Sequence, residues 1–529
     1  MATGPNLVDL PPELHQDLLE YINSYLDLKS LCLTCKTLQQ LATPTLYRSI
    51  TLLVSDTNDR IQRSLNQANQ GLVHTRTLRI RELNQAYDHA VQGESLCRLI
   101  GSLPLDSLEI LDFCTRKEVP LDMTLLKHCR QRQLRILLLH SQSSERIIGP
   151  LLHASNFSNV TSITLYVATQ EDSEKGRQVL EHISHVQELS IFSARPESDD
   201  QDWAAVGLDI LQTLFKSWVD TAVQTPKLQL KNLLLRFFAC QHIAEVLAKV
   251  LVPAKLERLA FEDCWEPQMA LSGLSGAHLR LKTFDNRRSC STLVPYDPFT
   301  ENFLGNFKGL QQLRVSTEHG SASSTDFSWH ALQAHAETLR LLYIDDLGDD
   351  GDPYADAPYD RTISNFRKLC TKCSNLEQLV IQALPYPNDS PSSYESTLAP
   401  LLDCIELLPE LVSLRLIMYP GIMNRRPDDK KGIPHRDWNR ALFSLMHEVA
   451  NWVLSELHES CPRLIALAID VRPEGSDCIG EHNRTFSFLR EIKFDTFNRK
   501  EVGGYYTRTR SLRHYEPCSE IFDDYHKSW

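Results

Sequence analysis

A short apolar motif recurs along most of this chain, and it constrains the possible folds more than any other feature. In each copy an apolar residue is followed three positions later by a leucine or isoleucine, and two positions after that by another apolar residue. The central residues Leu111, Leu137, Ile163 and Leu189 are each 26 positions apart. Copies begin at Leu108, Leu134, Val160, Val186, Leu230, Leu256, Leu310, Leu339, Leu376, Leu411, Leu464 and Leu489, with weaker copies around Leu78 and Leu281.

A repeat of this length predicts a stack of similar units. The alternating apolar residues at the end of each copy indicate a short strand, and apolar residues at helical spacing lie between copies, as in residues 121–129 and 243–251. One strand and one helix cannot bury their own apolar faces, so neighbouring units must share a continuous core. The spacing falls within the roughly 20–29-residue range of leucine-rich repeats.

The first fifty residues follow a different pattern, which predicts three short helices. Asp9 can cap the first helix, and the two prolines that follow suit its first turn, where no N–H partner is needed. Asp27 is expected to open the second helix, and Pro44 is expected to end the third. Helices this short cannot bury a core alone, so some of their apolar faces must meet a partner or the following domain.

This N-terminal stretch resembles an F-box of the fungal type over residues 7–50. The resemblance rests on Leu-Pro-Pro-Glu-Leu at 10–14, Tyr-Ile-x-x-Tyr-Leu-Asp-Leu at 21–28 and Pro-Thr-Leu-Tyr-Arg-Ser-Ile at 44–50. It implies docking onto the small adaptor subunit of a cullin-based (SCF-type) ubiquitin ligase. The apolar contacts to that adaptor are expected from Leu10, Pro11, Pro12, Leu14, Ile22, Leu28, Leu31 and Leu33.

We therefore predict an α/β chain in which a three-helix F-box precedes a leucine-rich-repeat solenoid, with parallel strands on the concave side and helices outside. Residues 51–74 are expected to link the two parts, residues 75–497 to form irregular repeats, and residues 498–529 to cap the last repeat. Cys373 and Cys461 each precede the first leucine of a copy by three positions, which resembles the cysteine-containing repeats that follow F-boxes. An F-box followed by such repeats implies a receptor for a protein substrate of the ligase.

Two readings of the function remain open on the sequence alone. The first is the ligase receptor, which binds the adaptor, and through it a cullin, while the repeats bind an unidentified protein substrate. The alternative is a leucine-rich-repeat interaction scaffold unrelated to ubiquitination, in which the N-terminal helices only cap the solenoid. Binding to the adaptor distinguishes the two.

Composition argues against several other classes of protein. The chain has 529 residues and a net charge of −13, whereas nucleic-acid binding needs a basic surface. The start of the chain has no secretory signal pattern, and no apolar run approaches the roughly 18 residues that a membrane helix needs. The 14 cysteines in a chain of this length do not suggest a disulfide scaffold. A cytoplasmic or nuclear protein is expected.

No motif in the sequence predicts an active site, a cofactor or a metal. Cys370 and Cys373 have metal-ligand spacing, but no second pair of ligands stands at a matching distance. His447 and Glu448 are not followed by the second histidine of a zinc protease, and the Gly-x-Ser-x-Gly and phosphate-loop motifs are absent. The chain is therefore not expected to be an enzyme.

The concave face of the predicted solenoid is the expected site for the substrate. Strand alternation turns the residues before, between and after the last two apolar positions of each motif toward this face. The proposed substrate contacts are Ile136, Leu138, His140, Tyr166, Phe192, Leu234, Arg236, Tyr343 and Asp345. Aromatic and arginine side chains are frequent at the centres of interfaces. The alternatives are that the strand register is wrong, or that another part of the chain covers this face.

Overall fold

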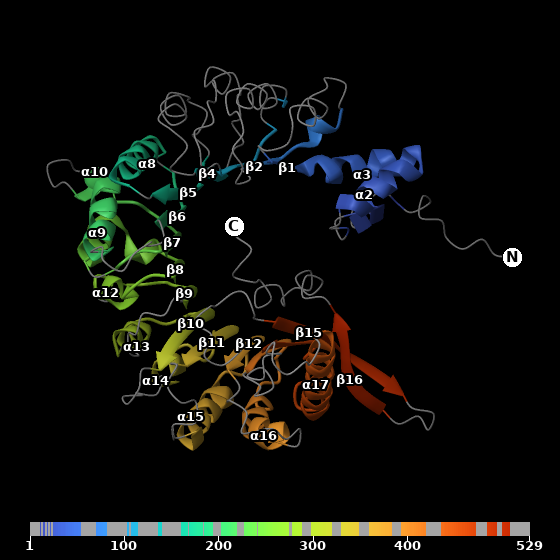
Figure 1. Cartoon of the computed structure of the whole chain (residues 1–529). Helices are drawn as coiled ribbons and strands as arrows, with labels where there is room; N and C mark the ends of the chain where they lie inside the picture. The colour runs from blue at the N-terminus through green and yellow to red at the C-terminus, as the bar shows by residue number, and fades with distance from the viewer. Residues whose placement is uncertain are drawn as a thin grey trace. The chain divides into compact units, whose positions relative to one another are not determined.

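The computed structural model describes residues 11, 14–15, 18–19, 22, 25–53, 70–81, 103–104, 107–114, 136–139, 160–167, 169–183, 185–193, 203–219, 227–240, 242–274, 278–287, 298–319, 329–348, 359–382, 393–418, 435–471, 484–494 and 500–507. Its contacts divide the chain into two compact parts, unit 1 (Met1–Val252) and unit 2 (Pro253–Trp529). Both parts contain helices and a mostly parallel arrangement of strands (Figure 1). Each is described by itself below.

Unit 1 begins with helices and continues as a parallel sheet. Strands β1 to β7 are neighbours in chain order, and each pairs in parallel with the next. The elements are α2 (Tyr25–Thr34), α3 (Lys36–Arg48), β1 (Ser49–Leu53), the 3₁₀ helix η2 (Gln70–His74), β2 (Thr77–Arg81), β3 (Ile110–Cys114), β4 (Ile136–Leu139), β5 (Ser162–Val167), α8 (Gln170–His182), β6 (Glu188–Ser193), α9 (Trp203–Leu214), α10 (Lys216–Val219), β7 (Asn232–Arg236) and α11 (Ala244–Val250).

Unit 2 follows the same plan. Strands β8 to β14 pair in parallel in chain order, and β15 and β16 are added in antiparallel fashion. The elements are the 3₁₀ helix η4 (Pro253–Lys255), β8 (Arg258–Glu262), α12 (Pro267–Ser272), β9 (Thr283–Arg287), α13 (Pro298–Gly305), β10 (Gln312–His319), α14 (Trp329–Gln333), β11 (Leu341–Gly348), α15 (Tyr359–Lys372), β12 (Gln378–Gln382), α16 (Ser393–Ile405), β13 (Ser413–Met418), α17 (His435–Glu456), β14 (Ala466–Val471), β15 (Arg484–Phe494) and β16 (Lys500–Thr507).

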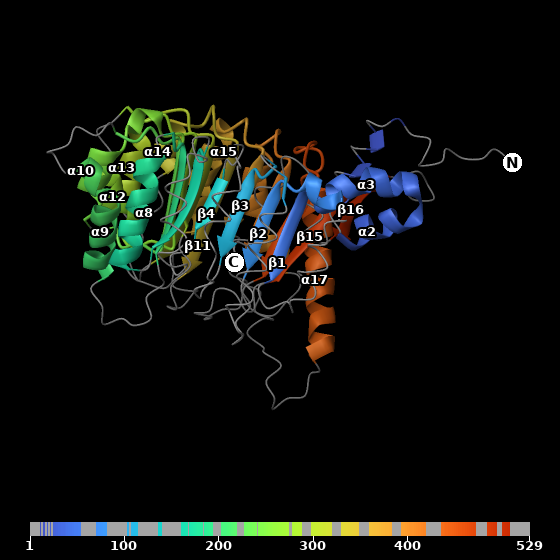
Figure 2. The same cartoon turned by 90° about the horizontal axis from the view of Figure 1, so that it is seen from above.

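The central residue of the repeat motif points into the core of each unit. Ile163, Leu189 and Leu233 are fully or almost fully buried. In unit 1, α8 and α9 lie on one side of β5 to β7 (Figures 1 and 2), and Gly176 of α8 sits close to the Leu165 side chain. The alternate residues of these strands therefore lie on the face that is turned away from α8 and α9, which we call the open face.

The turns before many of the described strands share one hydrogen-bond pattern. The N–H groups of Gln187 and Glu188 both donate to the Thr161 carbonyl, at 2.8 and 2.9 Å. In unit 2, the N–H groups of Arg340 and Leu341 donate to the Gln311 carbonyl at 2.8 and 3.0 Å. Since one carbonyl receives two N–H groups from the next repeat, neighbouring strands are held in a single register.

The final copy of the motif does not form a parallel repeat. The sequence predicts that Leu489, Ile492 and Phe494 form one more parallel strand, but β15 runs antiparallel to β14. The linking sequence, residues 472–483, contains a proline and two glycines and lacks the apolar pattern of a crossover helix. Ile492 and Phe494 are accordingly exposed rather than part of a repeat core.

The N-terminal helices have a small core of their own. Leu19, Leu28 and Ala42 are buried together, and Leu46 packs against them. The prediction that Pro44 ends the third helix is wrong, because α3 continues through Pro44 to Arg48. A proline inside a helix costs about 3 kcal/mol, and Leu46, two residues beyond it, stabilises this last part of the helix by packing against the helical core. The second helix, α2, begins at Tyr25, two residues before the expected start.

A buried histidine makes the stability of unit 2 dependent on pH. His335 is 1% exposed, its Nδ1 accepts a hydrogen bond from the Leu310 N–H at 3.3 Å, and its Nε2 lies 2.9 Å from the Leu304 carbonyl. These two contacts fit the neutral ring protonated at Nε2, because a second proton on Nδ1 would face another N–H. Burial lowers the pKa of His335, although the bond to Leu304 opposes this shift.

We expect the free energy of unfolding to fall as the pH drops below about 6.5, the ordinary pKa of an unfolded histidine. Below that pH the unfolded chain binds a proton that the folded chain resists, so His335 destabilises the fold progressively until its lowered pKa is passed. Urea unfolding of the wild type and His335→Gln at pH 7.5 and pH 5.5 measures this effect. The variant should lose less stability between the two pH values, and an equal loss would contradict the assignment.

Candidate functional site

The open face of β5, β6 and β7 brings three of the predicted substrate contacts together. Tyr166 is paired in register with Phe192, and Phe192 is paired with Arg236, so the three side chains form one row across neighbouring strands. The row lies at the carboxyl ends of the strands, where each chain leaves the sheet. All three residues follow the central residue of their motif copy by three positions, and the structure shows that they are neighbours in the sheet.

The two rings of this row are held in a defined arrangement. The ring centroids of Tyr166 and Phe192 are 4.8 Å apart at an interplanar angle of 63°, a favourable edge-to-face geometry. The Arg236 guanidinium lies 5.9 Å from the Phe192 ring and 4.9 Å from the Phe237 ring. Both aromatic residues of the Tyr166–Phe192 pair are partly exposed, whereas Arg236 is 4% exposed. Arg236 therefore supports the rings rather than presenting a cation to a partner.

The backbone of Phe237 makes this arrangement possible. Its φ is 60°, in the left-handed region that a bulky residue rarely adopts. The next residue, Phe238, is fully buried, so the turn after β7 places one phenylalanine in the core and the other against Arg236. Strained residues of this kind persist only where the surrounding structure holds them, and they are frequent at functional sites.

The open face becomes polar toward the amino ends of the same strands. Thr164, Ser190 and Leu234 form the middle row, and Ser162, Glu188 and Asn232 form the row at the strand starts. The Asn232 side-chain amide donates to Glu188 Oε1 at 2.8 Å. The face therefore has an aromatic end and an acidic end, with Thr164, Ser190 and Leu234 between them.

The other predicted substrate contacts lie outside the row formed by Tyr166, Phe192 and Arg236. Ile136 and Leu138 belong to β4 and pair with Ser162 and Thr164. Ile136 therefore continues the row at the strand starts, and Leu138 continues the middle row. Leu234 lies in the middle row itself. His140 is outside the described residues. Tyr343 and Asp345 belong to β11 of unit 2, where Tyr343 packs against a buried cluster that includes Leu341 and Val380.

Sequence reasoning missed three residues of this site. Glu188 and Asn232 satisfy the same alternation rule as Phe192, but they carry no aromatic or arginine signal. Phe237 lies beyond the motif, and no sequence pattern shows that its backbone is left-handed.

Comparison with known proteins does not assign this chain to a family. No protein-family model matches the chain, and no curated protein matches it. Among solved structures, a match is found with the crystal structure of the Rad7 and Elc1 complex in yeast, at 14% identity and a TM-score of 0.36. That match covers 80% of this chain and 90% of the other. A likeness this loose identifies neither a family nor a function.

The residues predicted to contact an adaptor fall into two groups. Leu14 and Leu33 are exposed, at 47% and 78%, and Pro11 is exposed as well. Leu28 is 6% exposed and lies in the helical core, while Ile22 and Leu31 are partly buried against that core. Leu28 therefore stabilises the helices and offers little surface to a partner. Leu10 and Pro12 are outside the described residues.

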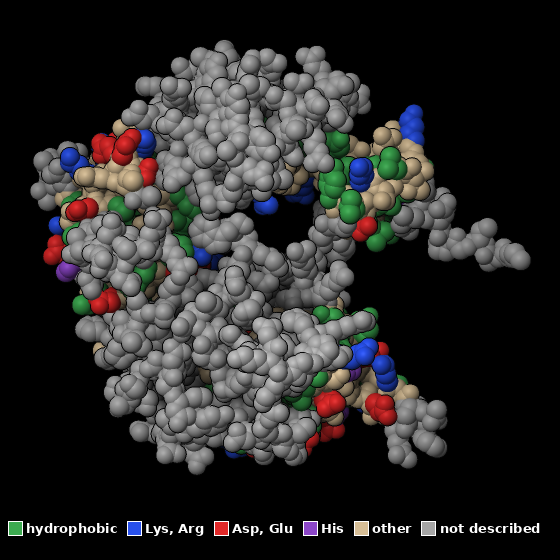
Figure 3. Space-filling view, in the orientation of Figure 1, with side chains coloured by type: hydrophobic (Ala, Val, Ile, Leu, Met, Phe, Trp, Pro, Cys, Tyr) green, Lys and Arg blue, Asp and Glu red, His purple; other side chains and the backbone are tan. Residues whose placement is uncertain are grey.

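Further apolar side chains are exposed on the same helical segment. Leu18, Tyr25 and Leu26 join Leu14 and Leu33 as large apolar residues turned to solvent, and apolar surface is visible on these helices in Figure 3. Leu18 is 43% exposed and therefore belongs to this surface rather than to the helical core.

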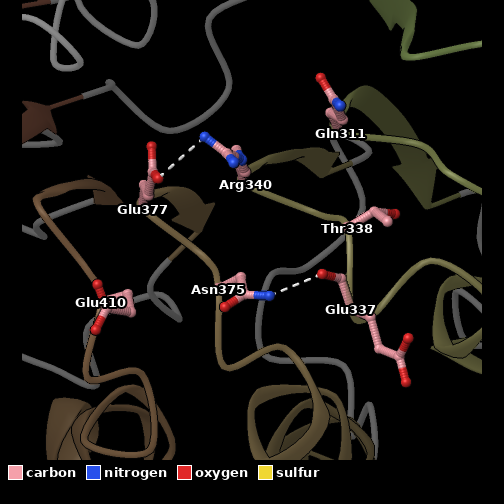
Figure 4. Close-up of a pocket in the computed structure, with 7 residues that line it drawn as sticks. All are labelled: Gln311, Glu337, Thr338, Arg340, Asn375, Glu377 and Glu410. Carbon is pink, nitrogen blue, oxygen red and sulfur yellow. Dashed lines mark hydrogen bonds and ion pairs between the residues drawn. The ribbon is translucent and has the colours of Figure 1, made fainter.

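A second concave feature lies at the helix-to-strand turns of unit 2. Its volume is about 260 Å³, and it is lined by Gln311, Glu337, Thr338, Arg340, Asn375, Glu377 and Glu410 (Figure 4). Arg340 and Glu377 form an ion pair at 3.5 Å, and the Asn375 amide donates to the Glu337 carbonyl at 2.8 Å. These contacts join one turn to the next. We therefore assign the pocket a structural role in the stacking of repeats.

The cysteines of unit 2 are suited to packing rather than to chemistry. Cys370, Cys373, Cys404 and Cys461 are buried free thiols. Burial raises the pKa of Cys373 to about 12 and that of Cys461 to about 11, and it also raises the pKa values of Cys370 and Cys404. Metal binding and nucleophilic attack both need the thiolate. Among the described residues, no group of three or more metal-ligating side chains is found.

None of the helices in the described segments combines sufficient length with sufficient apolar character to cross a membrane.

Proposed function

We propose that this protein recruits a protein substrate to a cullin-based, SCF-type ubiquitin ligase in the cytosol or nucleus and performs no chemistry itself. In this proposal the N-terminal helices bind the small adaptor subunit, and the repeats bind the substrate. The observation that carries it is the set of large apolar side chains exposed on helices that already possess a core. These residues are Leu14, Leu18, Tyr25, Leu26 and Leu33.

The division between core and surface on these helices supports a docking role. Leu19, Leu28 and Ala42 account for the internal packing, so the exposed leucines are not needed to fold the segment. Clustered apolar side chains on a soluble protein usually mark an interaction site. Leu14 and Leu33 are also among the positions at which the F-box resemblance implies adaptor contacts.

The test is a Leu14→Ala/Leu33→Ala double variant in a binding assay with the purified adaptor. Both side chains are exposed, so the free energy of unfolding should change by no more than about 0.5 kcal/mol per substitution. Loss of two apolar contacts should weaken adaptor binding by roughly tenfold or more. Affinity capture of the adaptor and urea unfolding of the same protein measure the two effects separately.

Val73→Ala provides the matched control, because Val73 is 50% exposed and lies outside the N-terminal helices, in η2. The control should bind the adaptor as the wild type does. A folded double variant with unchanged adaptor binding would remove these leucines from the interface. A wild-type chain that does not bind the adaptor at all would instead favour the interaction scaffold.

A further inference from the structure

The aromatic end of the open face is built to receive an apolar side chain. Tyr166 and Phe192 are partly exposed on a face whose other described positions are mostly small or polar. Their edge-to-face contact at 4.8 Å fixes both rings before any partner arrives. A partner that stacks on fixed rings loses little conformational entropy in ordering them, which favours binding.

Arg236 acts as a positioning residue for this end. Its guanidinium lies between the rings of Phe192 and Phe237, at 5.9 and 4.9 Å, and only 4% of the residue is exposed. It therefore restricts the movement of Phe192 from the side that faces β7. The left-handed backbone of Phe237 holds the second ring in place.

The acidic end of the face is set by Glu188. This residue is exposed, and its carboxylate accepts one hydrogen bond, from Asn232 at 2.8 Å. Among the described residues, no lysine or arginine forms an ion pair with it. A carboxylate has about four acceptor positions, so Glu188 can accept further hydrogen bonds from a cationic group. The Asn232 amide fixes its orientation on the face.

The distance between the two ends defines the spacing of a ligand. Glu188 and Phe192 are four residues apart on β6, which corresponds to roughly 13 Å along a strand. An extended peptide covers the same distance in about four residues. Ser190, which is partly exposed, lies between the ends, and its small side chain allows a peptide backbone to approach the sheet.

We propose that the open face of β5 to β7 binds an extended peptide that places an aromatic side chain on Tyr166 and Phe192 and a lysine or arginine against Glu188, about four residues away. Charge complementarity at Glu188 and the fixed aromatic pair together define this occupant. Identifying the peptide as part of a ubiquitination substrate rests on the proposed function, whereas the binding itself does not.

The test uses fluorescein-labelled eight-residue peptides with the full-length chain. One pair contains a tryptophan and a lysine separated by three serine or glycine residues, in either order, and a matched pair has glutamate in place of lysine. Fluorescence polarisation at low salt should show that the lysine peptide of one order binds at least tenfold more tightly than its glutamate counterpart. Equal binding of the two, or no binding by any of the peptides, would overturn the proposal.

Variants locate the binding on the face. Glu188→Gln should lower the affinity for the lysine peptide by about five- to tenfold. The control, Glu171→Gln, removes the same charge from the exposed side of α8 and should not change this affinity. Tyr166→Ala should lower the affinity for all tryptophan peptides by about tenfold. Phe192→Leu should also lower this affinity. Because leucine keeps most of the apolar volume, this variant is expected to remain folded. Wild-type affinity in the ring variants would overturn the site.

Adaptor binding is measured on the same proteins to separate the two proposals. The open-face variants should bind the adaptor as the wild type does, and the Leu14→Ala/Leu33→Ala variant should bind the peptide as the wild type does. Failure of adaptor binding with intact peptide binding contradicts only the proposed ligase role. Failure of peptide binding with intact adaptor binding contradicts only the inference about the open face.

Discussion

Replacing Phe303 with alanine is expected to lower the free energy of unfolding of unit 2 by about 3–5 kcal/mol. Phe303 lies on α13 and is fully buried. Its ring centroid is 5.3 Å from that of Phe284 on β9 and 5.4 Å from that of Phe307. Phe307 in turn lies 4.9 Å from the His335 ring. The substitution would leave a cavity between a strand, its helix and the next repeat.

The effect should extend beyond one repeat, because neighbouring repeats share their core. Urea unfolding followed by circular dichroism measures the loss. Phe494→Ala is the matched control, since it removes the same side chain from a position that is 64% exposed, and it should change stability by about 0.5 kcal/mol or less. Equal effects of the two substitutions would show that the ring cluster does not stabilise the fold.

The strands of both units were largely predictable from the sequence because one motif specifies them repeatedly. A leucine at the central position, flanked at fixed distances by apolar residues, determines both the location of the strand and the face that is buried. Ile163, Leu189 and Leu233 are buried as this pattern requires. The row of Tyr166, Phe192 and Arg236 followed from the same arithmetic, because equal positions in successive motifs become neighbours in a parallel sheet.

The helices and the end of the sheet were less predictable. The ring cluster around Phe303 lies in segments between motifs, where no fixed spacing identifies the packing partner. The change of strand direction at β15 depends on the connection, residues 472–483, rather than on the motif that follows it. In the N-terminal segment, the packing of Leu46 outweighs the helix-breaking tendency of Pro44. In each case a tertiary contact or a chain connection, rather than the local sequence pattern, determined the structure.

The energetic roles of the candidate site residues also required the structure. The sequence treats Arg236 as an exposed contact, because its position in the motif equals that of Phe192. In the structure Arg236 is 4% exposed and lies 4.9 Å from the ring of Phe237, whose backbone is left-handed. Conversely, Glu188 became a site residue only once its exposure and its bond to Asn232 were known.

The junction at which the sheet of unit 2 changes from parallel to antiparallel contains a buried ion pair. Asp470 of β14 accepts hydrogen bonds from Arg415 of β13, whose Nε lies 2.7 Å and whose terminal nitrogen lies 2.6 Å from Oδ2. The other oxygen accepts a bond from Thr485 of β15 at 2.7 Å. The two charged side chains are only 11% and 6% exposed. One carboxylate therefore connects three consecutive strands.

Asp470→Ala is expected to destabilise unit 2 by about 3–5 kcal/mol, because it leaves the buried Arg415 guanidinium without this carboxylate. A double variant, Arg415→Met/Asp470→Leu, removes both charges and should recover most of that loss, since well-packed apolar residues often replace a buried ion pair without cost. Urea unfolding is measured for the wild type, Asp470→Ala, Asp470→Leu, Arg415→Met and the double variant. The wild type, Asp470→Leu, Arg415→Met and the double variant form a double-mutant cycle. If Asp470→Ala is as stable as the wild type, the pair does not hold the junction. If the double variant is no more stable than Asp470→Ala, the two side chains stabilise the junction through the hydrogen bonds that position the strands. Neutralising each other's buried charge would then not be their main role.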